Sequence, residues 1–85
     1  MNTLKKNYRG ADLCLELDND DARLLINGIS RDQGTVTSSL RLSSTVQTDY
    51  ELHEFIQGVI IRNDNSLTAK LIAGNTDIAS EDFTA

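Results

Sequence analysis

One short stretch of the sequence has the residue types of a zinc-protease helix. His53 and Glu54 are followed by Gln57, at the position where the H-E-x-x-H motif has its second histidine. Catalytic zinc needs three protein ligands and an open coordination position, and His53 is the only histidine in the chain. We therefore predict no metal and no cofactor, and interpret His53 as a packing residue at the border of an apolar face.

Three other groups of reactive residues also lack parts that their chemistry needs. Residues 18–21 (DNDD) resemble the start of a calcium loop, but Arg23 and Ile29 stand where the loop glycine and the bidentate glutamate belong. Residues 28–32 (GISRD) lack the final glycine of a nucleophile elbow. Cys14 lies between two acidic residues, whose charges disfavour the reactive thiolate. Because each motif lacks residues that its chemistry needs, we predict that the protein is not an enzyme.

Length and composition predict one small domain with a thin core. The 85 residues are 39% hydrophobic and 25% charged, with no proline and no tryptophan. A chain this short buries only about 60–65% of its unfolded surface, which disfavours a deep cleft. The single cysteine gives no sign of an oxidising compartment, and no long apolar stretch predicts a signal peptide or a membrane partner. We expect a cytoplasmic protein.

Charge is distributed unevenly along the chain. Lys5, Lys6 and Arg9 give the first ten residues a charge of +3, and the remainder carries five positive and thirteen negative side chains, or −8. Nucleic-acid binding depends on Lys and Arg neutralising phosphates, so this charge distribution disfavours nucleic acid as a partner. An acidic body instead favours a partner protein with a basic surface.

Alternating apolar residues predict an antiparallel meander in the first half of the chain. Residues 11–17 place Ala11, Leu13, Leu15 and Leu17 on one face of a strand. Further strands are expected at 23–29 and 35–44, with turns at 18–21 and 32–34.

A helix is predicted next, which makes the fold class α+β. Thr48 and Glu51 have the spacing of a capping box, and an apolar stripe at helical spacing follows. That stripe comprises Leu52, Phe55, Ile56, Val59 and Ile60. Residues 66–73 fit a fourth strand, which we favour, or a short helix. The predicted order is β-β-β-α-β over residues 11–74, with one helix packed on a three- to four-stranded sheet, a basic arm at 1–10 and a frayed acidic tail at 75–85.

Two predicted surfaces remain once this core is built. On the helix, a second stripe of Tyr50, Glu54, Gln57 and Ile61 would point away from the sheet. On the sheet, Leu25 and Ile29 would lie with Cys14 on the far face. Aromatic and apolar residues in polar surroundings are typical of protein interfaces. These residues are our candidate partner-binding sites.

These features together predict a non-enzymatic protein-binding module. In its size, its acidity and its lack of motifs the chain is similar to small accessory proteins of phages and mobile elements. That similarity of type implies an inhibitor or adaptor acting on a basic, nucleic-acid-handling partner. The alternative is a homo-oligomer, such as a homodimer, with a structural or accessory role.

Overall fold

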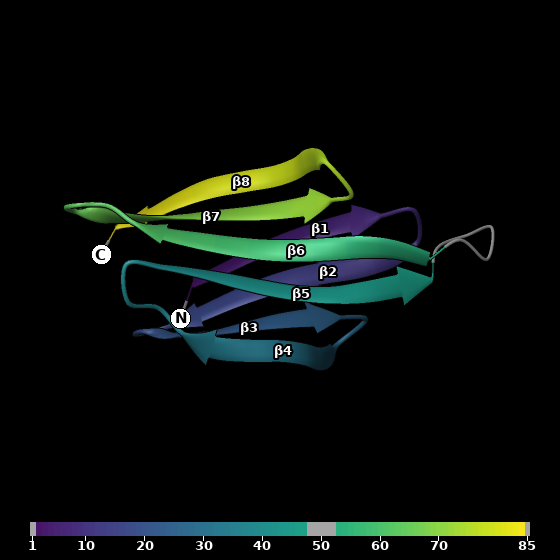
Figure 1. Cartoon of the computed structure of the whole chain (residues 1–85), viewed down its shortest axis with the longest axis horizontal. Helices are drawn as coiled ribbons and strands as arrows, with labels where there is room; N and C mark the ends of the chain where they lie inside the picture. Colours follow the sequence, from purple (N-terminus) through teal and green to yellow (C-terminus); the bar gives the residue numbers. More distant parts are fainter. Residues whose placement is uncertain (1, 48–52, 85) are drawn as a thin grey trace.

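The computed structural model describes residues 2–47 and 53–84, and within them the chain forms eight strands in two antiparallel sheets. The first sheet has the order β1-β2-β3-β4 and the second β5-β6-β7-β8, so each is a meander of neighbouring strands. The sheets lie one behind the other as a sandwich (Figure 1). The strands are β1 (Asn2–Tyr8), β2 (Ala11–Asp18), β3 (Asp21–Ile26), β4 (Ile29–Thr35), β5 (Ser39–Gln47), β6 (His53–Arg62), β7 (Ser66–Ala73) and β8 (Thr76–Thr84).

Tight turns with positive φ connect several of these strands. Asn27 and Gly28 have φ angles of 53° and 80°, the pair of left-handed residues that a two-residue hairpin turn requires. The Asn27 side chain also accepts a hydrogen bond of 2.9 Å from the backbone N–H of Asp12. This bond ties the β3–β4 turn to β2.

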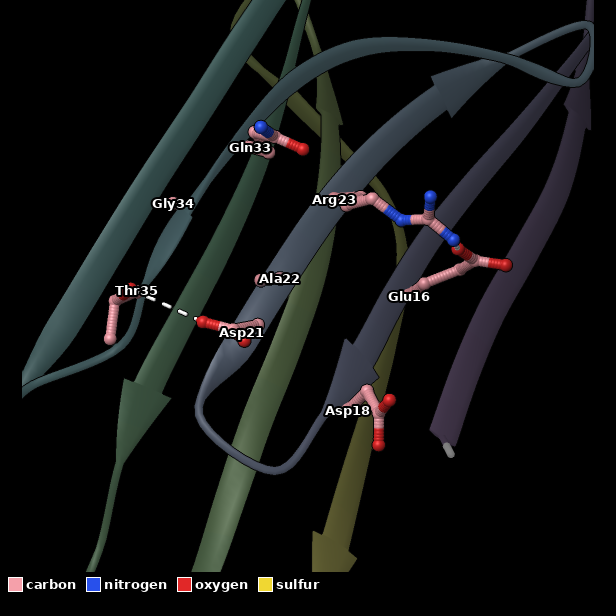
Figure 2. Close-up of a pocket in the computed structure, with 8 residues that line it drawn as sticks. All are labelled: Glu16, Asp18, Asp21, Ala22, Arg23, Gln33, Gly34 and Thr35. Atoms are coloured by element: carbon pink, nitrogen blue, oxygen red, sulfur yellow. Dashed lines mark hydrogen bonds and ion pairs between the residues drawn. The ribbon is translucent and has the colours of Figure 1, made fainter.

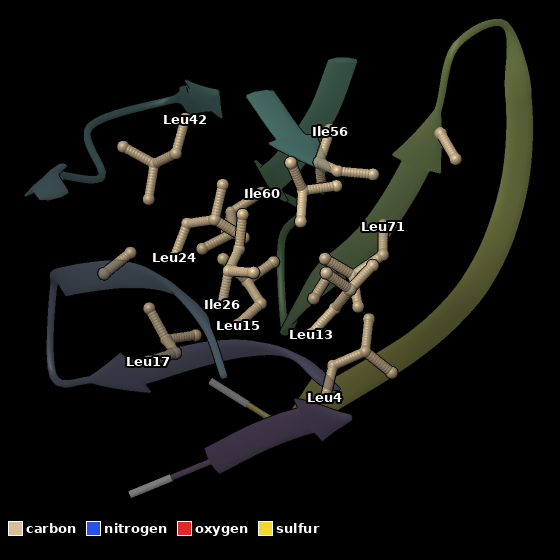
Figure 3. Packing of buried hydrophobic residues seen from close by; sticks show 14 of the residues in the cluster. Leu4, Leu13, Leu15, Leu17, Leu24, Ile26, Leu42, Ile56, Ile60 and Leu71 are labelled. Carbon is tan, nitrogen blue, oxygen red and sulfur yellow. The ribbon is translucent and has the colours of Figure 1, made fainter. Parts of the chain in front are cut away.

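The core is built from the inner faces of both sheets (Figure 3). The largest fully buried side chains come from β2, β3, β6 and β7. They are Leu13, Leu15, Leu24, Ile26, Ile56, Ile60 and Leu71. Gly58 of β6 also faces inward, and a Cβ atom there would lie 2.8 Å from Leu15 Cδ1. A glycine at this position therefore allows the two sheets to approach each other closely.

Charged side chains protect three edge strands from pairing with other chains. Lys6 of β1, Asp32 of β4 and Glu81 of β8 lie opposite inward-facing residues of the neighbouring strand and so share their face. An inward-pointing charge on an edge strand is a common device against edge-to-edge association. Asp32 also accepts a hydrogen bond of 3.0 Å from the backbone N–H of Ser43, which covers part of the β5 edge.

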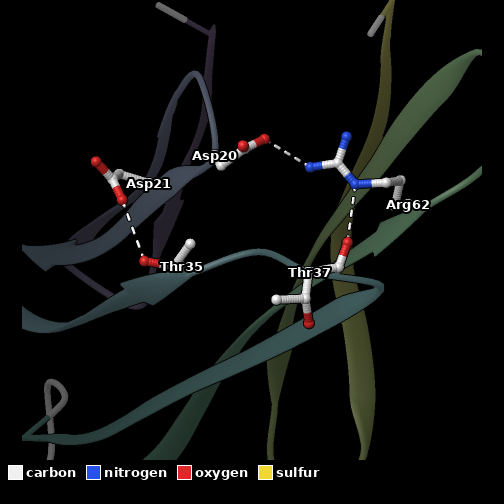
Figure 4. A network of polar contacts seen from close by, with 5 residues as sticks. All are labelled: Asp20, Asp21, Thr35, Thr37 and Arg62. Atoms are coloured by element: carbon white, nitrogen blue, oxygen red, sulfur yellow. Dashed lines mark hydrogen bonds and ion pairs between the residues drawn. The ribbon is translucent and has the colours of Figure 1, made fainter.

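Arginine side chains join the two sheets at opposite ends of the sandwich. At one end, Arg62 of β6 donates to Asp20 Oδ1 at 2.7 Å and to the Thr37 carbonyl at 2.9 Å (Figure 4). At the other, Arg9 after β1 contacts Glu54 Oε1 at 2.9 Å. A hydrogen bond with Glu54 also raises the pKa of Tyr8.

The predicted helix, and with it the α+β fold class, is wrong. Residues 53–62 form β6, paired with β5 and β7, and the described part of the chain holds no helix. In β6, Ile56, Gly58 and Ile60 face inward, while Phe55, Val59 and Ile61 face outward. Apolar residues on both faces of a strand mimic a helical stripe. The proposed capping box lies outside the described residues.

The predicted antiparallel pairing of strands is found, but the single predicted sheet is wrong, because the strands form two four-stranded sheets, and several strand boundaries are wrong as well. The strands predicted at 11–17 and 66–73 are confirmed as β2 and β7. The predicted strand 23–29 is interrupted by the turn at residues 27–28. The predicted turn at 32–34 is wrong, because these residues belong to β4, and the predicted strand 35–44 is divided between β4 and β5.

The two ends of the chain carry edge strands. β1 lies within the predicted basic arm and pairs along its length with β2, and β8 lies within the predicted acidic tail and pairs with β7. Leu4 of β1 is buried in the core, and Ile78 and Phe83 of β8 pack against it. This packing explains why both segments are ordered strands.

Candidate binding surfaces

A hollow of about 420 Å³ lies on the outer face of the first sheet, formed by β2, β3 and β4. We call it the acidic hollow (Figure 2). Its lining consists of Glu16, Asp18, Asp21, Ala22, Arg23, Gln33, Gly34 and Thr35. Ala22 and Gly34 lie opposite each other and belong to the inward-facing rows, so mainly backbone lines this part of the hollow.

The acidic hollow carries more negative than positive charge. Glu16 forms an ion pair with Arg23 across the β2–β3 ladder. Asp21 accepts a hydrogen bond of 3.2 Å from the Thr35 hydroxyl, a neutral group. Asp18 adds a third carboxylate at the exposed end of β2. With three carboxylates and one guanidinium the lining has a formal charge of −2, which suits a lysine or arginine side chain.

Cys14 lies beside the acidic hollow, on the outer face of β2. Burial raises the pKa of its thiol, the Glu16 carboxylate raises it further, and Lys5 and Arg23 oppose these effects. At neutral pH the protonated thiol therefore predominates. This environment gives a weak nucleophile.

The outer face of the second sheet carries apolar side chains on its two central strands, with Gln57, Thr68 and Lys70 among them. Phe55 and Ile61 of β6 are 45% and 39% exposed, and Val59 lies between them on the same face. Ile72 of β7 lies directly opposite Gln57 of β6 and so joins this face. We call the surface made by Phe55, Val59, Ile61 and Ile72 the apolar face.

Charged groups flank the apolar face on both sides. On the β5 side, Arg41 donates to Gln57 Oε1 at 2.7 Å. On the β8 side, Asp82 accepts a hydrogen bond of 2.7 Å from Thr68, and Asp77 lies 3.9 Å from Lys70 Nζ. The face is therefore positive at one edge and negative at the other.

The structure separates the residues that the sequence grouped as candidate sites. Gln57 and Ile61 do share a surface, the outer face of the second sheet, where Ile61 is part of the apolar face. Glu54 lies opposite Val46, on the inner side of the sheet, and bonds Arg9. Tyr50 lies outside the described residues.

The second predicted pair is also divided. Leu25 lies opposite Cys14 on the outer face of the first sheet, as predicted. Ile29 pairs instead with the inward-facing Ile26 and is 60% exposed at the edge of that sheet. Sequence reasoning missed Phe55, whose outward direction follows once residues 53–62 are counted with a period of two.

No metal-binding arrangement is formed by the side chains of residues 2–47 and 53–84, since no three His, Cys, Asp or Glu residues there are suitably grouped. The described residues also contain no helix long and apolar enough to cross a membrane. Comparison with protein-family models, with curated proteins and with solved structures finds no match for this chain.

Proposed function

We propose that the protein is a non-enzymatic binding module that acts in the cytoplasm on a partner protein with a basic surface, as an inhibitor or adaptor. The acidic hollow carries this proposal. It brings together carboxylates from two strands, and its formal charge of −2 lies within a chain whose net charge is −5.

The hollow has the chemistry to accept a basic side chain of the partner. Asp18 and Asp21 offer carboxylate oxygens, and neither forms an ion pair with a cation among the described residues. The backbone beside Ala22 and Gly34 leaves room for the aliphatic part of a lysine or arginine. Charge-assisted hydrogen bonds to carboxylates are stronger than neutral ones. The surrounding acidity raises the rate of encounter with a basic protein.

Partner capture with charge variants tests the proposal. Immobilised wild-type protein should retain a basic protein from an extract of the native cell, and the Asp18→Asn/Asp21→Asn variant should lose it. The matched control, Asp64→Asn/Glu81→Gln, removes the same charge from other surfaces and should retain the partner. Rising salt should release the partner, because the Debye length falls from about 10 Å at 0.1 M to about 3 Å at 1 M.

Two results would contradict this function. Equal retention by both double variants would show that the hollow is not the binding site. Retention that is independent of salt would remove the argument from charge.

A further inference from the structure

We propose that the apolar face binds a second copy of this chain, forming a symmetric dimer in which the two β5–β8 sheets pack face to face. This inference does not depend on the acidic hollow, which lies on the opposite sheet. It starts from the contrast between the two outer faces. The first sheet presents the Glu16–Arg23 pair and further carboxylates, whereas the second presents Phe55, Val59 and Ile61 along its β6 strand.

The exposure of two large apolar side chains on one strand indicates a surface that another protein covers. Phe55 lies between Thr45 of β5 and the Gly74 turn, whose N–H bonds the Phe55 carbonyl at 2.9 Å. Since glycine has no side chain, one flank of the ring is left open. Val59, by contrast, lies between Arg41 and Lys70 and is only 9% exposed. Its long neighbours already cover it.

The order of charges across the face identifies the partner as a second copy. Arg41 is on β5, at one edge, and Asp77 and Asp82 are on β8, at the other. A two-fold axis parallel to the strands places β5 of each copy over β8 of the other. Arg41 then faces Ser80 of the second copy, because Arg41, Val59, Lys70 and Ser80 form one row across the sheet. Asp82 of the second copy lies two residues further along β8.

The same charges exclude the other symmetric arrangement. A two-fold axis perpendicular to the strands would place β5 over β5 and β8 over β8. The two β5 edges, each carrying Arg41, would then lie against each other, and so would the two β8 edges with their carboxylates. Like charges across an interface are unfavourable and act against a wrong arrangement. The charge pattern therefore selects the axis parallel to the strands.

The area of the face is sufficient for a dimer of modest affinity. Four strands spaced by about 4.8 Å, with about 3.3 Å of rise per residue over nine residues, make a face of roughly 19 by 30 Å. Two such faces bury roughly 1,100 Å², just above the lower limit of about 1,000 Å² for a specific interface. We therefore expect a dimer that dissociates on dilution.

Sedimentation velocity over a dilution series from about 1 mM to about 1 μM, the range of weak complexes, tests the proposal. The apparent mass of the wild-type protein should fall from twice 9.4 kDa towards 9.4 kDa as the protein is diluted. Ile61→Asp should remain monomeric throughout the series. The matched control Ile29→Asp changes another exposed isoleucine, away from the apolar face, and should dimerise like the wild type.

Charge-reversal variants test the orientation without changing any buried residue. Arg41→Glu and Asp82→Lys should each be monomeric at concentrations where the wild type is dimeric. An equimolar mixture of the two should recover the dimer. In the mixed dimer, the two substituted residues carry opposite charges and face each other, and the second contact keeps the native Arg41 and Asp82.

Three outcomes would overturn the proposal. They are a wild type that stays at 9.4 kDa throughout the series, a dimer that persists in Ile61→Asp, and single charge variants that dimerise as well as the wild type. The polar variants also remain informative if Ile61→Asp fails to fold.

Discussion

Two neighbouring residues of β6, Phe55 and Ile56, should differ sharply in their contribution to stability. Ile56 is fully buried, whereas Phe55 is 45% exposed on the opposite face. In the rejected helix both residues would have faced the core. The substitutions Ile56→Ala and Phe55→Ala therefore distinguish the observed strand from a helix.

The expected magnitudes follow from burial. Ile56→Ala removes three buried carbons, worth about 2.4 kcal/mol at about 0.8 kcal/mol each. A cavity between the sheets adds to this, so we expect a loss of about 3–4 kcal/mol in the free energy of unfolding. Phe55→Ala removes a larger side chain, but roughly half of it already contacts water and solvent fills the space. We expect a loss of about 1 kcal/mol.

Urea unfolding followed by circular dichroism measures both losses. At roughly 0.05–0.15 kcal/mol per residue, 85 residues give a total of about 4–13 kcal/mol, so Ile56→Ala removes a large part of it. With an m-value near 1 kcal/mol/M, the low end for small proteins, the two midpoints should differ by about 2 M. The protein should be kept dilute, so that dimer formation does not contribute. An equal or greater loss in Phe55→Ala would refute the inward and outward assignment in β6.

Three further predictions concern the contacts between the sheets and the single thiol. Arg62→Ala should lower the free energy of unfolding by about 1 kcal/mol, and Arg9→Ala should lower it by less. The reason is that Arg62 bonds both Asp20 and a backbone carbonyl of the β4–β5 loop. Equal losses in urea unfolding would contradict this ranking. Gly58→Ala should lower the free energy of unfolding by about 1–3 kcal/mol, because the added Cβ would lie 2.8 Å from the side chain of Leu15 on the facing sheet. An unchanged melting temperature would show that the sheets are less closely packed there. Iodoacetamide should alkylate Cys14 more slowly in the folded protein than in urea at pH 8. Burial, and to a smaller extent the Glu16 carboxylate, raises the pKa of the folded thiol. A faster reaction in the folded protein would contradict a raised pKa.

The sequence predicted best those strands whose two faces differ in polarity. In β2, alternate residues from Ala11 to Leu17 are all at most 3% exposed, and the residues between them are polar or half-buried. The alternation of apolar and polar residues in such a strand is visible in the sequence itself. The Asn27-Gly28 pair is a similarly clear signal for a hairpin turn, but the apolar residues on both sides of it predict one strand over 23–29, which misplaces the β3–β4 boundary.

The acidic hollow could not be predicted in the same way, because it depends on the pairing of three strands. Glu16 and Arg23 meet only when β2 and β3 are in register. Thr35 joins Asp21 only through the β3–β4 pairing, which contains an irregularity between Leu24 and Leu25. No periodicity within one strand specifies either contact. The hollow therefore depends on how the three strands pair in the sheet.

The failure to predict β6 has a different cause, and that cause is informative about binding. A strand covered on one face only would alternate between apolar and polar residues. In β6 the outward positions of Phe55, Val59 and Ile61 are apolar as well, with Gln57 among them, and Phe55 and Val59 completed the false helical stripe. The inward row of Ile56, Gly58 and Ile60 faces the core of the monomer. The monomer leaves Phe55 and Ile61 of the outward row exposed, and a second sheet packed on them would give both faces of β6 an apolar neighbour.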